Sequence, residues 1–183
     1  MDEDATHSPY VSCDTSDYRV DFPKVQQLAR TICAQLGVSD YELSISFVDS
    51  KTIQELNSEH RGKDSPTDVL SFPQCEFDEP LLSSKKTELA KPSPDQPPKT
   101  LGDIIISLNE ASQNALKIGQ DLDKEVCFLL VHGVLHLCGH DHMEKGEENI
   151  MLGEQRKIMN LISDQTEIPL WNDAISSVQE GTL

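Results

Sequence analysis

The chain has 183 residues, a formal net charge of −17 and a sequence pI near 4.5. Its length and its hydrophobic fraction of 37% suit one domain with a hydrophobic core, and the lack of any run of 18 apolar residues predicts no membrane span. The acidic charge excludes binding of nucleic acid through the overall field of the molecule, so that any surface for a polyanion must be a local basic patch.

The N-terminal segment, MDEDATHSPYVSCD, is acidic and polar. This composition does not fit a secretory signal, and we therefore expect a cytoplasmic protein. Residues 1–18 are interpreted as an extension with a possible first strand, residues 19–165 as the functional domain, and residues 166–183 as a C-terminal tail.

Hydrophobic periodicity then predicts interleaved helices and strands. The expected helices are residues 23–36, a segment capped by Asp49 or Ser50, and residues 109–119, 123–138 and 144–162; the expected strands are residues 42–48, 68–72 and 101–108. The apolar run Ile104–Ile106 predicts that its strand is buried on both faces. Because the order is not a strict βαβ rhythm, we predict an α+β fold: a single domain with a small mixed sheet, about five helices and a metal site at the end of a buried helix.

Residues 74–100 differ in composition from the rest of the chain. They contain five of its ten prolines and few β-branched residues. Such a segment builds core poorly, so it is interpreted as a long, Pro-rich insertion on the surface of the domain.

The five cysteines are odd in number, irregularly spaced and without a CxxC pair. This pattern excludes a disulfide framework and the usual structural zinc module. We expect most of them, including Cys138, to be small buried apolar residues.

The string HGVLHLCGHDH, residues 132–142, predicts a metal site. His132 and His136 are four residues apart on the expected buried helix, so that both imidazoles lie on one face and can reach one ion. Gly139 permits the left-handed turn that ends a helix, after which His142 can approach as a third ligand. Three histidines leave one zinc position open to water, as catalytic sites do, and we predict one Zn²⁺ ion.

Two alternatives remain for these histidines. They could be core histidines bonded to the backbone, although unpaired imidazoles on an apolar helix are costly to bury. His140 could also replace His142 as the third ligand, although the spacing favours His142. The spacing is that of the metzincin proteases, HExxHxxGxxH, but Gly133 replaces the glutamate that is their general base.

Three strings together resemble a known family. HGVLHLCGHDH, LNSEHRGKDSPTDVLSFP (residues 56–73) and LGDIIIS (residues 101–107) are similar to motifs of the YbeY family of bacterial and organellar endoribonucleases. The resemblance extends over roughly residues 20 to 160. It implies a single-domain α+β metalloprotein that matures ribosomal RNA, notably the 3′ end of the small-subunit RNA, and acts in ribosome quality control.

The resemblance also assigns roles to individual residues. It places the three metal ligands on His132, His136 and His142 and the functionally important arginine on Arg61, which becomes a candidate clamp for the scissile phosphate. Lys63 is close enough in sequence to extend this basic patch. Members of the family usually have tyrosine where this chain has His140, and the insertion at 74–100 is longer than expected.

Together with this resemblance, these residues predict metal-assisted cleavage of phosphodiester bonds in single-stranded ribosomal RNA precursors, with Arg61 and His136 as catalytic residues and Arg61 and Lys63 as substrate-binding residues. The nucleophile is either metal-bound hydroxide or the RNA 2′-hydroxyl. We expect ribosomal RNA and the small subunit, its proteins or assembly factors as partners, and neither DNA nor a membrane. The competing hypotheses are a zinc hydrolase that acts on peptides and a non-catalytic ribosome-assembly factor with a structural metal.

Overall fold

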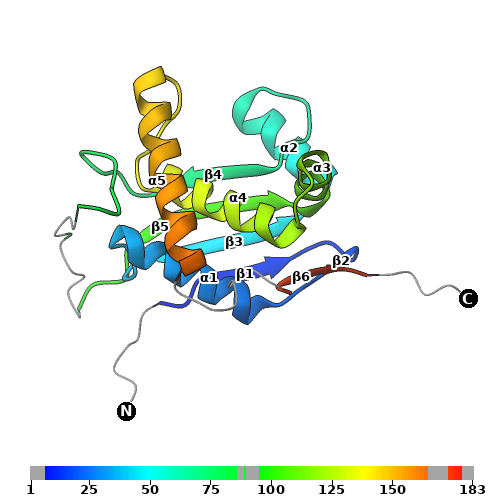
Figure 1. Ribbon diagram of the computed structural model, residues 1–183, viewed down its shortest axis with the longest axis horizontal. Coiled ribbons are helices and arrows are strands. Elements are labelled where there is room, and N and C mark those ends of the chain that lie inside the picture. The colour runs from blue at the N-terminus through cyan, green and yellow to red at the C-terminus, as the bar shows by residue number, and fades with distance from the viewer. Residues whose placement is uncertain (1–6, 86–88, 90–94, 165–172, 179–183) are drawn as a thin grey trace, which may run out of the picture.

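The computed structural model describes residues 7–85, 89, 95–164 and 173–178. Its centre is a mixed sheet of four strands in the order β1-β3-β5-β4, in which β1, β3 and β5 are parallel and β4 runs antiparallel to β5 (Figure 1). A separate antiparallel pair joins β2 to β6. The strands are β1 (Tyr10–Cys13), β2 (Tyr18–Val20), β3 (Glu42–Val48), β4 (Val69–Pro73), β5 (Thr100–Ser107) and β6 (Ile175–Ser177).

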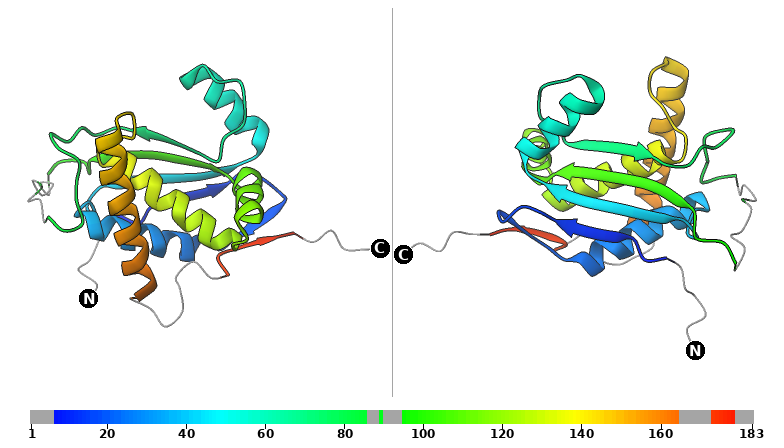
Figure 2. Two further views of the ribbon diagram at one scale, coloured as in Figure 1. Left: turned by 45° about the horizontal axis from the view of Figure 1, so that its top comes forward. Right: turned by 180° about the vertical axis from the view of Figure 1, so that it is seen from behind.

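Five helices lie in the described part of the chain, and they cover one face of the sheet and one end of it. They are α1 (Phe22–Leu36), α2 (Ser50–Arg61), α3 (Leu108–Ile118), α4 (Leu122–Leu137) and α5 (Lys145–Asp164). Figure 2 shows α1, α4 and α5 on the same face, while α2 and α3 lie together at one end of the strands. The predicted α+β fold is confirmed.

Local signals explain why the helices begin and end where they do. The Asp49 carboxylate accepts a hydrogen bond from the backbone N–H of Thr52 at 2.7 Å, so Asp49 caps α2 as the sequence suggested. The Asp21 carboxylate caps α1 in the same way, 3.2 Å from the N–H of Lys24. All five expected helices and all three expected strands are present, with bounds that differ by only a residue or two.

The main core lies between the sheet and the helices that cover it. Leu43, Ile45 and Phe47 alternate along β3 toward α1 and α4 and are almost completely buried. Ile104 and Ile106 of β5 belong to the same core, but Ile105 points to the opposite face and is only half-buried under α2. The strand is therefore not buried equally on both faces, because the residues from α2 and β4 form only a small second cluster there.

Two segments differ from the sequence interpretation. Leu81, within the insertion, is 3% exposed and packs into the main core. Within the expected tail, β6 pairs with β2, and the Asp123 carboxylate accepts hydrogen bonds from the backbone N–H groups of Ala174 and Ile175 at 2.8 and 2.9 Å. Both segments are held by contacts to distant parts of the chain, which leave no periodic signal in the sequence. Residues 86–88 and 90–94 of the insertion and residues 166–172 and 179–183 of the tail lie outside the described residues.

Gly102 makes a close contact between β5, β4 and α4 possible. Its φ of 147° is disfavoured for other residues, and a Cβ there would lie 2.3 Å from the Phe72 carbonyl oxygen and 2.9 Å from Leu137 Cδ2. Phe72 is in the edge strand and Leu137 ends the helix that carries two of the site histidines. Gly102 therefore allows α4 to lie close against this end of the sheet.

Replacing Gly102 with alanine should lower the free energy of unfolding by about 3 kcal/mol or more, because backbone strain adds to a clash with main-chain atoms. Urea denaturation of the wild type and G102A would measure this change. The matched control is G153A in α5, where a Cβ meets nothing within 4 Å and alanine should stabilise by about 0.5–1 kcal/mol. Equal stabilities of wild type and G102A would contradict the close contact.

Candidate metal centre

Two histidines of the site are held side by side on α4. Ten residues of this helix are buried, so it is fixed against both the sheet and α5. The four-residue spacing of His132 and His136 places their ring centroids 4.6 Å apart, and their Nε2 atoms are 3.0 Å apart. The positions of both imidazoles thus follow from the packing of the helix.

The third histidine comes from the loop after α4. Gly139 adopts a φ of 92°, the left-handed turn expected from the sequence, and donates a backbone hydrogen bond to His136 O at 3.1 Å. His142 then lies with its ring centroid 5.0 Å from that of His136 and 6.0 Å from that of His132. One ligand nitrogen from each of the three residues lies within 4.8 Å of the others, so the predicted three-histidine cluster is present.

The hydrogen bonds around this cluster suit a cation. His132 Nδ1 lies 3.3 Å from Gln155 Oε1, and because the Gln155 amide nitrogen donates to the Phe128 carbonyl, the oxygen must face His132. His136 Nδ1 lies 2.9 Å from the His140 carbonyl oxygen. Both Nδ1 atoms therefore carry the proton, and both Nε2 atoms present a lone pair to each other. Two lone pairs at 3.0 Å repel unless a cation lies between them, so the residues fit a bound metal ion.

The protonation states favour metal binding as well. Burial lowers the pKa of His132, and burial together with the neighbouring His132 lowers the pKa of His136 to about 4. Both imidazoles are thus neutral at physiological pH. A metal ion requires the neutral form as its ligand, so no proton has to be displaced first.

His140 does not compete for the third position. Its ring is 4% exposed, and its Nε2 donates a 2.6 Å hydrogen bond to the Leu81 carbonyl oxygen. In return, the backbone N–H of Leu81 donates to the Cys138 carbonyl at 3.1 Å. Cys138 is completely buried, as expected for a packing residue. The insertion is therefore bonded to both sides of the turn that carries His142.

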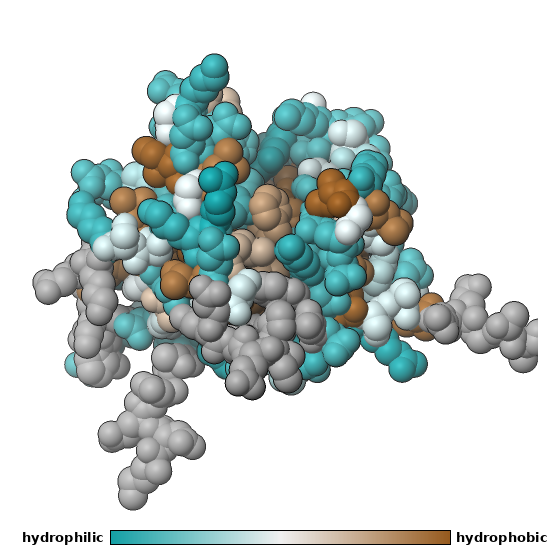
Figure 3. Space-filling model, in the orientation of Figure 1, coloured by the Kyte–Doolittle hydropathy of each residue, from teal (hydrophilic) through white to brown (hydrophobic). Residues whose placement is uncertain are grey.

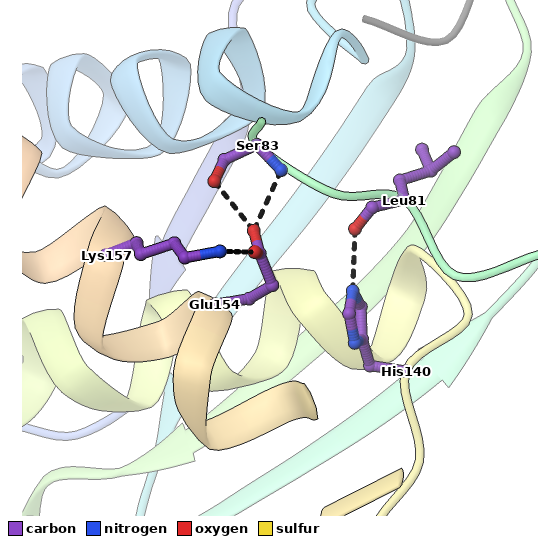
Figure 4. Close-up of polar contacts among 5 residues, drawn as sticks. All are labelled: Leu81, Ser83, His140, Glu154 and Lys157. Carbon is purple, nitrogen blue, oxygen red and sulfur yellow. Dashed lines mark hydrogen bonds and ion pairs between the residues drawn. The ribbon is translucent and has the colours of Figure 1, made fainter. Parts of the chain in front are cut away.

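A second set of contacts fixes the same part of the insertion to α5 (Figure 4). The Glu154 carboxylate is buried and accepts hydrogen bonds from the Ser83 N–H at 2.8 Å and from its hydroxyl at 2.7 Å. Lys157 pairs with the other oxygen of Glu154 at 2.8 Å. We call these contacts of Leu81 and Ser83 the insertion clasp. Sequence reasoning missed the clasp, because glutamate and serine 71 residues apart show no pattern.

The structure explains why glycine occupies position 133. A Cβ at Gly133 would lie 2.9 Å from Ile104 Cδ1 and 3.0 Å from its Cγ2, so this side of α4 packs against β5. A glutamate there would enter the core and could not serve as a base beside the three histidines. The position is thus a packing site of this fold.

Arg61 is the last residue of α2, and its positive charge adds slightly to the lowering of the His132 pKa that burial mainly causes. Among the described residues, neither the Arg61 nor the Lys63 side chain forms a hydrogen bond or an ion pair, so both are available to a ligand. Figure 3 shows the surface hollowed between the projecting end of α5 and α2, above α4, with apolar side chains on its floor. Arg61, as the last residue of α2, therefore belongs to the helix that lies across this hollow from α5.

Comparison with known proteins identifies the family. The family model described as endoribonuclease YbeY matches residues 10–163. The chain belongs to the endoribonuclease YbeY family. It is 42% identical over 138 residues to the endoribonuclease YbeY of Bacillus licheniformis, covering 75% of this chain and 82% of that protein. It is 38% identical over 136 residues to that of Bacillus cytotoxicus, covering 74% and 82% of the two chains.

A solved structure supports the fold. The solution structure of a Thermotoga maritima protein superimposes with a TM-score of 0.58 at 21% identity, and the match covers 96% of this chain and 99% of that one. Family membership makes the protein a metal-dependent hydrolase that cleaves RNA internally, as the sequence resemblance implied. The histidine cluster is compatible with the metal that this class requires. In the described part of the chain, no helix is long and apolar enough to cross a membrane.

The insertion clasp predicts a pH-dependent contribution to stability. Burial raises the pKa of Glu154, but the hydrogen bonds from Lys157 and Ser83 outweigh it and hold the pKa below the usual value. Glu154→Gln should therefore lower the free energy of unfolding by about 1–3 kcal/mol at pH 7. Because the folded-state pKa is depressed, this difference should be full above the unfolded pKa of about 4.3 and should shrink as the pH falls through the folded value.

Urea denaturation from pH 7 to pH 3 would measure this difference. The control is Glu79→Gln, whose carboxylate pairs with Lys85 at the exposed surface and should change stability by less than about 0.5 kcal/mol. A difference between wild type and E154Q that grows as the pH falls would contradict this account of Glu154.

Proposed function

We propose that this protein cleaves single-stranded ribosomal RNA precursors, notably at the 3′ end of the small-subunit RNA, with one zinc ion held by His132, His136 and His142. The observation that carries the proposal is the close approach of His132 Nε2 and His136 Nε2, which lie 3.0 Å apart with both Nδ1 atoms already hydrogen-bonded. The chain also belongs to a family of endoribonucleases.

Zinc is the metal that the donor set suits best. Neutral imidazole is a preferred ligand of zinc, and three protein ligands leave one tetrahedral position free. When bound, zinc acidifies a coordinated water and neutralises negative charge on phosphate oxygens. Within the chain, Gln155 and the His140 carbonyl hold His132 and His136 in the tautomer that exposes Nε2. His142 is exposed whereas His132 and His136 are partly buried, so a metal held by the three histidines would be accessible from the surface on the His142 side.

Arg61 is proposed as the phosphate clamp, with Lys63 beside it. The guanidinium group matches two phosphate oxygens at once and stays charged at any physiological pH. Gly62 ends α2 in the left-handed conformation, and the Lys63 N–H donates a hydrogen bond to Asn57 O at 3.3 Å. Arg61 and Lys63 therefore flank one tight turn. Their charges would hold the scissile phosphate and stabilise charge that develops in the transition state.

The two competing hypotheses fit less well. A peptidase of the HExxH type needs a base next to the first histidine, and that position faces Ile104 in the core. A purely structural zinc site usually has four protein ligands, whereas the cluster found among the described residues has three. We further propose that the substrate is presented by the small ribosomal subunit, its proteins or assembly factors in the cytoplasm, because a chain of charge −17 binds naked RNA weakly.

The cleavage reaction tests the proposal directly. A labelled single-stranded RNA that spans the 3′ end of the small-subunit RNA should be cut by wild type, and kcat/KM should fall about 10²–10³-fold in Arg61→Ala because a charge-stabilising group is lost. His136→Ala and a chelated sample should be inactive. The control is Arg30→Ala, which removes an arginine of α1 and should retain activity. Equal cleavage by every sample would reject the assigned site.

Metal binding can be measured without any RNA. Zinc at 100 times its dissociation constant should stabilise wild type by about 2.7 kcal/mol, which raises the melting temperature by about 5–10 °C. His136→Ala should lose this shift, while His7→Ala, at the exposed N-terminal end, should keep it. An unchanged shift in H136A would place the metal elsewhere.

A further inference from the structure

A pocket of about 340 Å³ lies next to the histidine cluster, between the end of α3 and the middle of α4. It is lined by Asn114, Lys117, Ile118, Gln120, Glu125 and Phe128. From this geometry we propose that the pocket binds one unstacked nucleobase of the RNA strand, next to the phosphate that is cut. The inference rests on the proposed function and specifies how its substrate is recognised.

The position of Phe128 connects the pocket to the metal centre. Its ring is 38% exposed on a helix that is otherwise mostly buried, and it stacks on His132 with a centroid separation of 6.3 Å and an interplanar angle of 19°. Gln155 bonds both the Phe128 carbonyl and the His132 ring, so one side chain of α5 fixes both residues. A strand whose phosphate lies at the histidines therefore passes Phe128 directly.

The apolar walls of the pocket suit the flat face of a base. Phe128 forms one wall and Ile118, which is largely exposed at the end of α3, forms another. Figure 3 shows apolar side chains at the surface on this side of the hollow. Single-stranded RNA is usually recognised by bases that stack on aromatic rings in this way.

The polar lining of the pocket contains side-chain oxygen atoms to which no described residue donates a hydrogen bond. One oxygen of Glu125 accepts from the Gln120 amide, while the second oxygen and the side-chain oxygens of Asn114 and Gln120 accept no hydrogen bond from any described residue. Glu125 is 5% exposed, so its oxygen is costly to leave unpaired. A ligand that brings N–H donors would satisfy these atoms.

This excess of acceptors selects among the four bases. Cytosine, adenine and guanine each present an exocyclic amino group, and a carboxylate accepts readily from such a group. Uracil has one N–H donor flanked by two carbonyl oxygens, which the Glu125 carboxylate would repel. Lys117 lies at the rim, where it can contact the backbone phosphate. We therefore expect an amino-bearing base in the pocket.

The test measures binding of single-stranded RNA hexamers by fluorescence anisotropy, with a chelator present so that the strand is not cut. Each base in turn is replaced by an abasic site. In wild type, one abasic position should weaken binding roughly 5- to 100-fold, as expected for the loss of one stacked base. Phe128→Leu should bind the intact hexamer with that weaker affinity and should not respond to the abasic site, because the same interaction is already lost.

Two further variants keep the result interpretable. Phe128→Tyr retains the ring and should behave as wild type even if the leucine variant is unstable. Leu116→Ala removes a 79% exposed side chain of α3 outside the pocket lining and should change nothing. In wild type, uracil at the sensitive position should bind more weakly than cytosine, and Glu125→Gln should reduce this difference.

The outcomes separate this inference from the proposed function. If wild type cuts RNA but no abasic position matters, or F128L responds to abasic sites as wild type does, the pocket is not a base subsite while the nuclease proposal stands. If wild type fails to cut but shows the position-specific loss, the subsite stands and the reaction has been misassigned.

Discussion

The packing of α4 against the sheet determines the rest of the site. Two imidazoles four residues apart lie on the same face of this buried helix, and their Nδ1 atoms are already bonded to Gln155 and to the His140 carbonyl. The two Nε2 lone pairs therefore face each other at 3.0 Å, an arrangement that costs energy in the free protein. Folding therefore favours the binding of a cation between the two Nε2 atoms, because the packing of α4 in the core holds these atoms close together.

The insertion clasp extends this constraint to the third histidine. His142 lies on an exposed turn, which would be free to move if only Gly139 shaped it. Leu81 bonds both sides of this turn, and Ser83 is held by a buried carboxylate of α5. The same helix provides Gln155, which bonds His132. A segment whose composition predicts a surface loop therefore connects α5 to the loop after α4, next to the histidine cluster.

Much of this structure could be predicted from the sequence, since local signals decided it. The helices and strands of the sheet follow from periodicity, and the Asp49 side chain marks the start of α2 by capping it. The histidine cluster follows from spacing on one helix. What escaped prediction depends on contacts between distant residues: the β2–β6 pair, the burial of Leu81, and the pairing of Ser83 with Glu154. The sequence shows that Gly133 occupies the position where the metzincin proteases have a glutamate. Only the structure shows that a side chain at this position would contact Ile104.

The strongly acidic charge becomes understandable once the site is described. A chain of charge −17 repels RNA at long range, and Arg61 and Lys63, whose side chains have no partner among the described residues, lie together at the end of α2. Repulsion beyond a Debye length of about 8 Å is screened at physiological ionic strength, so a short unpaired segment can enter while a long duplex remains unfavourable. Non-specific electrostatic attraction to the phosphate backbone therefore contributes little to RNA binding by this chain. On the proposals made above, recognition would come from contacts with an unstacked strand: a base against Phe128 and a phosphate against Arg61. A strongly acidic chain is therefore compatible with membership of an endoribonuclease family, because a few basic side chains near the site can contact the RNA.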